Sequence, residues 1–294
     1  MGIVKSSFSP SVNIQRDQSK EFDYIVTSNA RQIYDQLVRN RDTGTHSFTI
    51  IGSYGTGKSS FLIALKKHFQ EKNTQFFEPL NGHFPDVKNF HFDFVVGKYG
   101  SLIEELAQYF GLDGEASEKD ILEWIKEKHK KLKKEHTFWF LVIDEFGKHL
   151  EYAAKENPEK ELYFVQLLSE FANEKEKNIY FITSLHQAFD SYAHGLNLQQ
   201  RKEWDKVRGR LKELTFNEPV EQLLHIASEF LKTGDEKGNE ENLEQLIRGI
   251  EASRAFPLKN ELDLDLAQSL YPLDPLSAAT LALALQKYGQ NERS

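Results

Sequence analysis

Eight residues, Gly52-Ser-Tyr-Gly-Thr-Gly-Lys-Ser59, match the spacing G-x-x-x-x-G-K-[ST], in which a glycine-rich backbone curls around a chain of phosphates. The glycines let successive backbone N–H groups face the phosphates, and the N-terminus of a following helix favours the same negative charge. Lys58 would supply a positive charge for the β- and γ-phosphates, and the Ser59 hydroxyl would be a ligand for Mg²⁺. The residues expected to bind the nucleotide are Gly52, Ser53, Tyr54, Gly55, Thr56, Gly57, Lys58, Ser59 and Ser60.

A second group that could do chemistry is the pair Asp144-Glu145, which follows the apolar run Phe138–Ile143. Ligands of parallel sheets bind at the carboxyl ends of the strands, so both acids are expected beside the phosphate loop. We expect Asp144 to hold Mg²⁺, directly or through water, and Glu145 to act as general base on the attacking water. A glutamate next to the metal-binding aspartate favours hydrolysis over transfer of phosphate to another substrate.

Two hydroxyls, those of Thr183 and Ser184, end another apolar segment that begins at Ile179. If that segment is a strand next to the one carrying Asp144, either hydroxyl could contact the attacking water or the γ-phosphate. The alternative is a hydroxyl that caps the next turn of the chain. His186 follows closely enough to lie near the same site or to stabilise that turn.

Two arginines, Arg208 and Arg210, precede the last strand-like segment. The planar guanidinium donates several hydrogen bonds at fixed geometry and so suits a trigonal phosphoryl group. The alternative is a surface basic pair near Lys206 and Lys212, because basic residues at helix ends need no further function.

The elements that must position these residues alternate between strand-like and helix-like patterns. The strand-like segments are 47–52, 90–96, 138–143, 179–183 and 211–216, and the helix-like segments are 30–39, 58–69, 102–110, 163–172 and 199–207. Strands that alternate with helices indicate a parallel sheet covered on both faces. We therefore predict an α/β fold, the three-layer sandwich of a P-loop NTPase with a parallel five-stranded sheet.

After residue 216 no strand-like run follows, and the segments 220–231 and 276–288 have helical periodicity. We predict a domain boundary there, with a P-loop core over 1–216 and an all-helical subdomain over 217–294. The highly charged segment 115–135 has few residues to bury, which predicts an insertion helix on the surface.

Composition excludes several classes of protein. The 294 residues are 39% hydrophobic and 28% charged, which is typical of a globular chain, and no apolar run approaches the length of a membrane span. The chain lacks cysteine and a signal-peptide pattern, so we expect a cytoplasmic protein without thiol chemistry, and the ten histidines show no zinc-ligand spacing. A net charge of −8 argues against a surface that attracts DNA as a whole, although a local basic patch is still allowed.

Taken together, the phosphate loop, the apolar strand ending in Asp-Glu, the hydroxyl-ended strand, the arginine pair and the helical tail resemble the AAA+/STAND group of P-loop ATPases over residues 20–294. The resemblance implies that residues 217–294 form a lid and that subunits assemble into a homo-oligomer when ATP binds. It also implies roles for individual residues, namely Lys58 and Ser59 as the Walker A pair, Asp144 and Glu145 as the Walker B pair, Thr183 as sensor 1, and Arg208 or Arg210 as an arginine finger. The start of the last helix, at Leu276, lacks the sensor-2 arginine of many AAA+ lids.

Within that group, five segments resemble the large ATPases of bacterial phage-defence systems of the BREX type: 144–148, 184–187, 208–210, 271–276 and 289–294. The resemblance implies a defence-system effector as partner, and a longer polypeptide of which this chain is the ATPase part.

Three functions follow from these observations. The first is a Mg²⁺-dependent ATPase that couples its nucleotide state to assembly or conformational change in antiviral defence or DNA processing. The second is a slow nucleotide-dependent switch or DNA-binding initiator platform, which the acidic charge disfavours for this segment alone. The third is a small-molecule or nucleotide kinase, which needs neither the Asp-Glu pair nor the helical tail. ATP is expected rather than GTP, because no Asn-Lys-x-Asp guanine signature is present.

Overall fold

The computed structural model describes residues 12–20, 24–71, 76–79, 82–113, 116–217, 220–231, 238–255 and 262–288. The chain divides into two compact units. The first consists of residues 1–26, 30–52 and 57–216, and the second of residues 27–29, 53–56 and 217–294.

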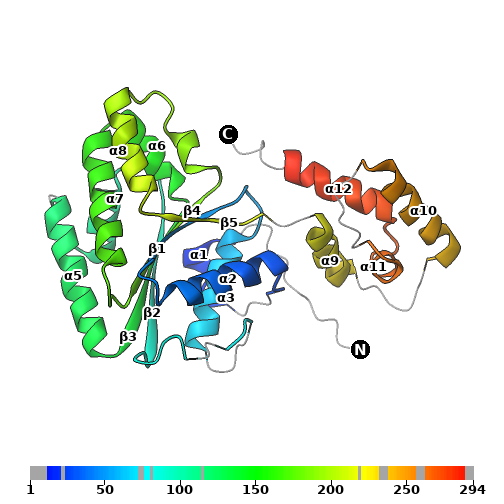
Figure 1. The fold of residues 1–294 in the computed structure, drawn as a ribbon, viewed down its shortest axis with the longest axis horizontal. Coiled ribbons are helices and arrows are strands. Elements are labelled where there is room, and N and C mark those ends of the chain that lie inside the picture. Colours follow the sequence, from blue (N-terminus) through cyan, green and yellow to red (C-terminus); the bar gives the residue numbers. More distant parts are fainter. Residues whose placement is uncertain are drawn as a thin grey trace. The chain divides into compact units, whose positions relative to one another are not determined.

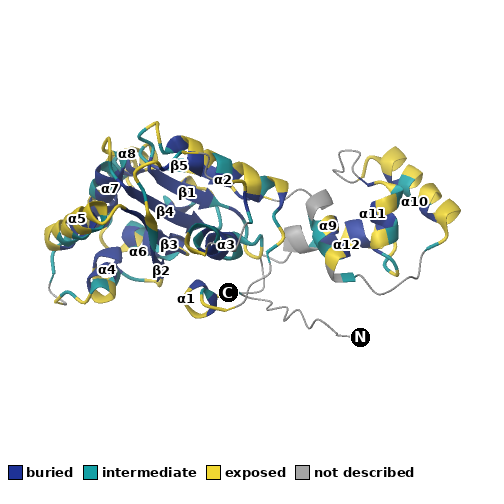
Figure 2. Ribbon diagram, turned by 90° about the horizontal axis from the view of Figure 1, so that it is seen from below, coloured by how far each residue is buried: buried dark blue, intermediate teal, exposed yellow. Residues whose placement is uncertain are grey.

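The first unit is built on a five-stranded sheet in which all neighbouring strands are parallel. The strands lie in the order β2 (Asn89–Val96), β3 (Thr137–Asp144), β4 (Ile179–Leu185), β1 (Ser47–Ile51) and β5 (Lys212–Thr215). Every residue of β3 and β4 is buried, as Figure 2 shows, which explains why these strands are apolar on consecutive residues. The predicted parallel five-stranded sheet is confirmed.

Helices cover both faces of this sheet (Figure 1). One face packs against α1 (Ile14–Asp17), α2 (Ser28–Asn40) and α3 (Lys58–Gln70). The other face packs against α4 (Leu102–Phe110), α5 (Glu118–Lys134), α6 (Gly147–Lys155), α7 (Pro158–Asn173), the 3-10 turn η1 (Phe189–Tyr192) and α8 (Leu198–Arg208). The result is the predicted three-layer sandwich, because parallel strands need crossover connections that return over a face of the sheet.

In the first unit, neither α1 nor α6 has a predicted counterpart, and α7 begins earlier than predicted. Helix α6 is only nine residues long and begins with a glycine, so it carries no recognisable start signal. Helix α7 begins at Pro158, five residues before the predicted start, because Asn157 caps it and a proline suits the first turn.

The second unit contains the helices α9 (Val220–Leu231), α10 (Glu240–Ser253), α11 (Leu264–Ser269) and α12 (Pro275–Tyr288). A small core of its own includes Leu224, Ile250, Leu266 and Leu270. The described part of 217–294 contains helices and no strand. The segment 289–294, on which part of the defence-ATPase resemblance rests, lies outside the described residues. Within the described residues, no helix has the length and apolar character needed to cross a membrane.

The predicted insertion helix is α5, and it is less solvated than its charge suggests. Asp93 on β2 is buried and accepts a hydrogen bond from Trp139 Nε1 at 2.7 Å and another from Tyr109 Oη at 3.2 Å. Lys128 of α5 also donates to this carboxylate, and its ammonium lies 5.0 Å from the Trp139 ring centroid. Although burial acts to raise the pKa of Asp93, the hydrogen bonds from His91 and Lys128 lower it to about 2. Asp93 therefore holds α5 against the edge of the sheet.

We expect Asp93→Ala to lower the free energy of unfolding by about 1–3 kcal/mol, because the Trp139 indole and the Lys128 ammonium lose a buried acceptor. Glu127→Ala is the matched control on α5, since the Glu127 side chain is 75% exposed and its loss should change stability by less than about 0.5 kcal/mol. Urea denaturation at pH 7 measures both differences.

The same comparison has a defined pH dependence. The Asp93 pKa is lowered from 3.8 to about 2 by folding, so its contribution is complete above about pH 4 and disappears as the pH falls toward 2. The stability gap between wild type and Asp93→Ala should narrow over that range. A stability difference that stays constant between about pH 4 and pH 2 would show that the ion pairs of the Asp93 carboxylate do not contribute to it.

Candidate nucleotide site

The phosphate loop has the backbone conformation that its glycines allow. Gly55 and Gly57 both have positive φ, at 77° and 93°, a region that other residues rarely adopt. Gly57 is the N-cap of α3, so the helix begins at Lys58 and its first N–H groups are left without helical partners. The first turn of α3 contains no acidic residue. The loop thus ends at a helix N-terminus that favours a negatively charged ligand.

The sheet brings this loop and the acid pair together. The loop follows β1, the acids follow β3, and β4 lies between these two strands, with Gly52 N donating to Leu185 O at 3.0 Å. Ser59 Oγ, in the first turn of α3, donates to Asp144 Oδ2 at 2.7 Å, although 85 residues separate them in sequence. The phosphate loop and the acid pair therefore lie next to each other at the carboxyl edge of the sheet, where the sequence predicts them.

Lys58 lies within its own loop, where its ammonium donates to Gly52 O. Burial lowers the pKa of Lys58 to about 8, while the negative charges of Asp144 and Glu145 act in the opposite direction. The two carboxylates thus keep a positive charge where a phosphate chain would need one.

Asp144 and Glu145 have contrasting environments. Asp144 is 5% exposed, and its carboxylate accepts hydrogen bonds from Ser59 Oγ, Ser184 Oγ and the Glu145 backbone N–H. Glu145 is exposed and has a left-handed backbone with φ of 54°. The buried acid is suited to fixed contacts, and the exposed acid is accessible to water and substrate.

The structure does not bring Thr183 to this cluster. Its hydroxyl is buried and lies 2.8 Å from Thr49 Oγ1, with a second contact to Phe48 O. Successive side chains of a strand point to opposite faces, so only one of the two hydroxyls can face the acids. That hydroxyl belongs to Ser184, the other of the two hydroxyls named from the sequence, and not to Thr183, to which the resemblance assigns sensor 1.

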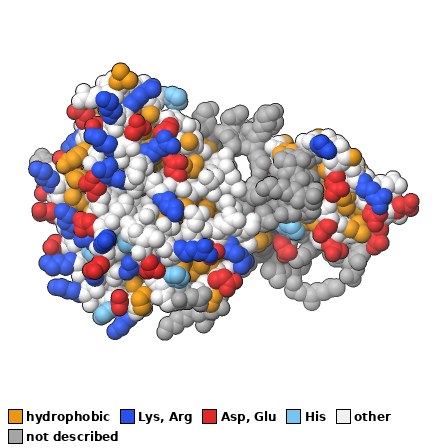
Figure 3. Space-filling model, in the orientation of Figure 1, with side chains coloured by type: hydrophobic (Ala, Val, Ile, Leu, Met, Phe, Trp, Pro, Cys, Tyr) orange, Lys and Arg blue, Asp and Glu red, His pale blue; other side chains and the backbone are white. Residues whose placement is uncertain are grey.

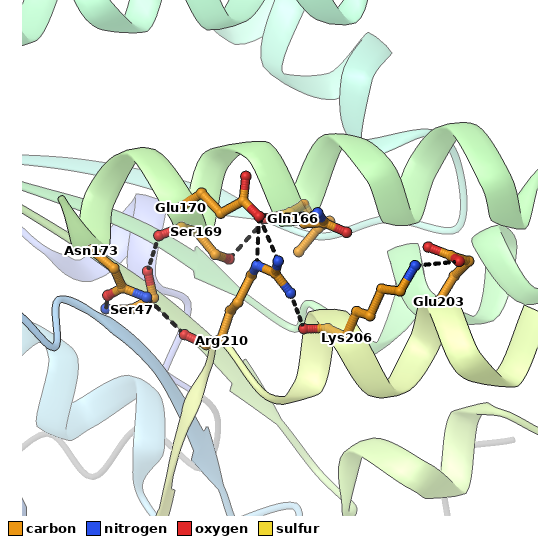
Figure 4. Close-up of polar contacts among 9 residues, drawn as sticks. Ser47, Gln166, Ser169, Glu170, Asn173, Glu203, Lys206 and Arg210 are labelled. Atoms are coloured by element: carbon orange, nitrogen blue, oxygen red, sulfur yellow. Dashed lines mark hydrogen bonds and ion pairs between the residues drawn. The ribbon is translucent and has the colours of Figure 1, made fainter.

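The two arginines are engaged in ion pairs with acidic side chains of their own chain. Arg210 donates to Glu170 of α7 at 2.7 Å and to the Lys206 carbonyl of α8 at 2.7 Å (Figure 4). Arg208 contacts Asp190 at 2.5 Å and Glu213 at 3.3 Å. Arg210 precedes β5, which runs parallel to β1, so it belongs to the amino edge of the sheet. The phosphate loop is at the carboxyl edge.

A contact between Tyr192 and His186 lies close to this region, and no sequence pattern predicts it. Tyr192 Oη lies 2.9 Å from His186 Nδ1, and a side chain at Gly147 would collide with the Tyr192 ring. Burial, together with the charges of Lys58 and Lys148, lowers the pKa of His186, which keeps the imidazole neutral. A histidine soon after a strand was the sequence signal, but the tyrosine contact depends on the fold of η1.

The donor set fits Mg²⁺. Ser59 Oγ and Asp144 Oδ2 already converge at 2.7 Å, and Mg²⁺ prefers oxygen ligands, keeps several waters and takes further oxygens from phosphates. Within the described residues, no group of three or more His, Asp and Glu side chains is placed to hold a metal ion by itself. Ser59 and Asp144 would therefore hold the ion together with the phosphates of a nucleotide.

The strand order, the two helical layers and the glycine loop between β1 and α3 define the α/β fold of the P-loop NTPases. No protein-family model matches the chain, and no curated protein is significantly similar to it.

Among solved structures, the chain is similar to the ORC2 protein of Aeropyrum pernix in its ADPNP–ADP complexes, with 14% identity, a TM-score of 0.47 and coverage of 84% of this chain and 69% of that one. It is similar to a Walker-type ATPase of Pyrococcus abyssi, with 12% identity, a TM-score of 0.48 and coverage of 90% and 73%. It is also similar to Cdc6p from Pyrobaculum aerophilum, with 18% identity, a TM-score of 0.41 and coverage of 91% and 65%. At this level of similarity, function has to be argued from the site.

We expect Lys58→Ala to weaken ATP binding by about two orders of magnitude, or ~3 kcal/mol, because it deletes the side-chain charge facing the phosphates among neutral backbone donors. Lys66→Ala is the matched control, since Lys66 lies on the same helix and donates to Gln18 at 2.7 Å. Isothermal titration with ATP measures both. Unchanged affinity in Lys58→Ala would reject the phosphate-loop assignment.

Proposed function

We propose that the chain binds ATP with Mg²⁺ and hydrolyses it. The observation that carries this proposal is the 2.7 Å contact between Ser59 Oγ and Asp144 Oδ2, which joins the phosphate loop to the acid pair. The backbone of the loop and Lys58 bind the phosphates, and Ser59 and Asp144 hold the ion. Bound Mg²⁺ would neutralise charge on the phosphate oxygens.

Glu145 is the proposed general base. It adjoins Asp144, it is exposed, and its carboxylate can accept a proton from water next to the γ-phosphate. We further propose that residues 1–216 are the ATPase core and that 217–294 form a helical lid. The contrast between a strand-containing unit and one whose described part is helical supports this division.

The second candidate is a slow nucleotide-dependent switch or DNA-binding initiator platform. On the face drawn in Figure 3, acidic and basic side chains are interspersed over the first unit, which does not favour DNA binding by that face. A kinase is disfavoured because Glu145 lies where it would activate water. ATP turnover measured with and without DNA separates these functions, since a DNA motor is stimulated, a switch stays slow, and a kinase needs an acceptor.

Within the ATPase proposal, we propose a role in bacterial antiviral defence or DNA processing, with a defence-system effector as partner. Support comes from the sequence resemblance of segments such as 144–148 and 184–187 to the BREX-type ATPases. Phage challenge of cells that carry the wild-type gene or its Lys58→Ala version tests this role. Equal protection by both versions would show that protection against phage does not depend on ATP binding.

Glu145→Gln is expected to keep ATP binding and to lower hydrolysis by about 10²–10⁴-fold, because the amide keeps the shape of the side chain and loses its basicity. A phosphate-release assay gives the rate, and chelation of Mg²⁺ with EDTA should abolish wild-type turnover in the same assay. Hydrolysis at the wild-type rate would mean that another residue is the base.

We expect Arg210→Ala, and by the same argument Arg208→Ala, to bind ATP normally and to hydrolyse it about 10³-fold more slowly if the arginine acts on a neighbouring subunit. Mixing Arg210→Ala with Lys58→Ala should then restore part of the activity. In the mixed assembly, an intact arginine on one subunit faces an intact phosphate loop on the next.

Glu170→Ala is the matched control, because it breaks the ion pair of Arg210 without removing the arginine. A partly exposed pair of this kind contributes only about 0–1 kcal/mol, so Glu170→Ala should keep its ATPase activity. Loss of activity in Glu170→Ala, with no rescue in the mixture, would show that Arg210 only joins α7 to α8.

A further inference from the structure

We propose that Gly97 and Ser184 are positioning residues that hold the backbone of Glu145 in its left-handed conformation and thereby aim the base. This inference rests on the proposed ATPase function. It concerns Ser184 near the end of β4 and Gly97 directly after β2, the two strands on either side of β3.

The Glu145 backbone is in a conformation that a glutamate does not adopt readily. Its φ of 54° lies in the left-handed region, which is unfavourable for residues with a Cβ. Such residues persist only where the surroundings hold them, and they are frequent at active sites. Glu145 is exposed, and its backbone sets the direction in which the Cα–Cβ bond leaves the chain.

Ser184 holds the N–H side of this residue. The Glu145 N–H donates to Ser184 Oγ at 3.0 Å and to Asp144 Oδ1 at 3.1 Å, and Ser184 Oγ itself donates to Asp144 Oδ1. The Ser184 carbonyl also accepts from Phe146 N at 3.0 Å. Ser184 therefore accepts hydrogen bonds from two successive backbone N–H groups of the turn after β3, those of Glu145 and Phe146.

Gly97 binds the other side of the peptide group between Asp144 and Glu145. It follows β2, and its N–H donates to Asp144 O, the carbonyl of that peptide group, at 2.7 Å. A Cβ at Gly97 would lie 2.5 Å from Glu145 O and 3.0 Å from Glu145 C, both of them backbone atoms that a side-chain rotation cannot move away. Glu145 O also accepts from Lys148 N at 3.1 Å at the start of α6. A larger residue at 97 must therefore displace the peptide that carries the base.

The main test compares two glycines of one loop. Gly97→Ala should lower kcat for ATP at least tenfold while changing the Kd for ATP less than twofold, because binding depends on the phosphate loop. Gly100→Ala is the matched control, since a Cβ there meets no atom within 4 Å, and it should behave as wild type. Wild-type kcat in Gly97→Ala would overturn the proposal.

Ser184→Ala should lower kcat about 10–100-fold, with Ser169→Ala, another buried serine, as the control at the wild-type rate. In a Glu145→Gln background, Gly97→Ala should not slow the residual hydrolysis further, because it acts through the base. Ser184→Ala also removes a donor from Asp144, so only Gly97→Ala is used in this comparison. If Gly97→Ala slows the residual rate by the same factor as in wild type, it acts by general damage and the proposal is wrong.

A third measurement needs no ATP. Glu145→Gly should melt about 2–4 °C above Glu145→Ala, because glycine relieves the left-handed backbone that alanine keeps. Equal melting temperatures would overturn the proposal even if Gly97→Ala fails to fold. If wild-type protein does not hydrolyse ATP, the proposed function fails. The melting comparison still decides whether the backbone of residue 145 is held in the left-handed conformation.

Discussion

The site depends on one buried carboxylate, that of Asp144. A charge with so little exposure is unfavourable unless hydrogen bonds replace the water it loses. Its donors are Ser59 of α3, Ser184 of β4 and the next backbone N–H, and Ser59 and Ser184 are 85 and 40 residues away from it in sequence. These donors meet only if β4 lies between β1 and β3 and all three strands end at one edge. Satisfying this carboxylate therefore requires the strand order that also assembles the phosphate loop with the acids.

The same contacts explain how the proposed general base, Glu145, can be both exposed and fixed. An exposed side chain gains little orientation from packing, whereas the peptide behind Glu145 is held by Ser184 on one side and has room only for a glycine at 97 on the other. A left-handed glutamate costs stability of the order of 1–3 kcal/mol. Strained residues of this kind are frequent at active sites, which supports the proposed role of Glu145.

Sequence alone predicts the α/β class, the parallel sheet and the position of the phosphate loop, because each has a local pattern: glycine spacing, apolar runs and alternating periods. It does not decide between Thr183 and Ser184, since that depends on which face of β4 meets Asp144. The proposed role of Gly97 depends on its contact with the backbone of Glu145, which lies 48 positions further along the chain, directly after the neighbouring strand β3. Lys128 belongs to the charged segment 115–135, in which the sequence does not distinguish one lysine from another. Only the fold shows that Lys128 donates to the buried Asp93 of β2.

The arginine pair shows how topology restricts mechanism. Strand β5 pairs with β1 in parallel, with Lys212 opposite Phe48 and Thr215 opposite Ile51, just before the phosphate loop. Arg210 therefore lies five residues before Thr215, in the turn that leads from α8 to β5 at the other end of the strand. Its guanidinium points to α7 and α8 instead (Figure 4). The proposed role of Arg210 in hydrolysis is therefore a role on another subunit, because at the amino edge Arg210 lies away from the phosphate loop of its own chain. The partly exposed pair with Glu170 is weak enough to be exchanged for a phosphate in the proposed assembly.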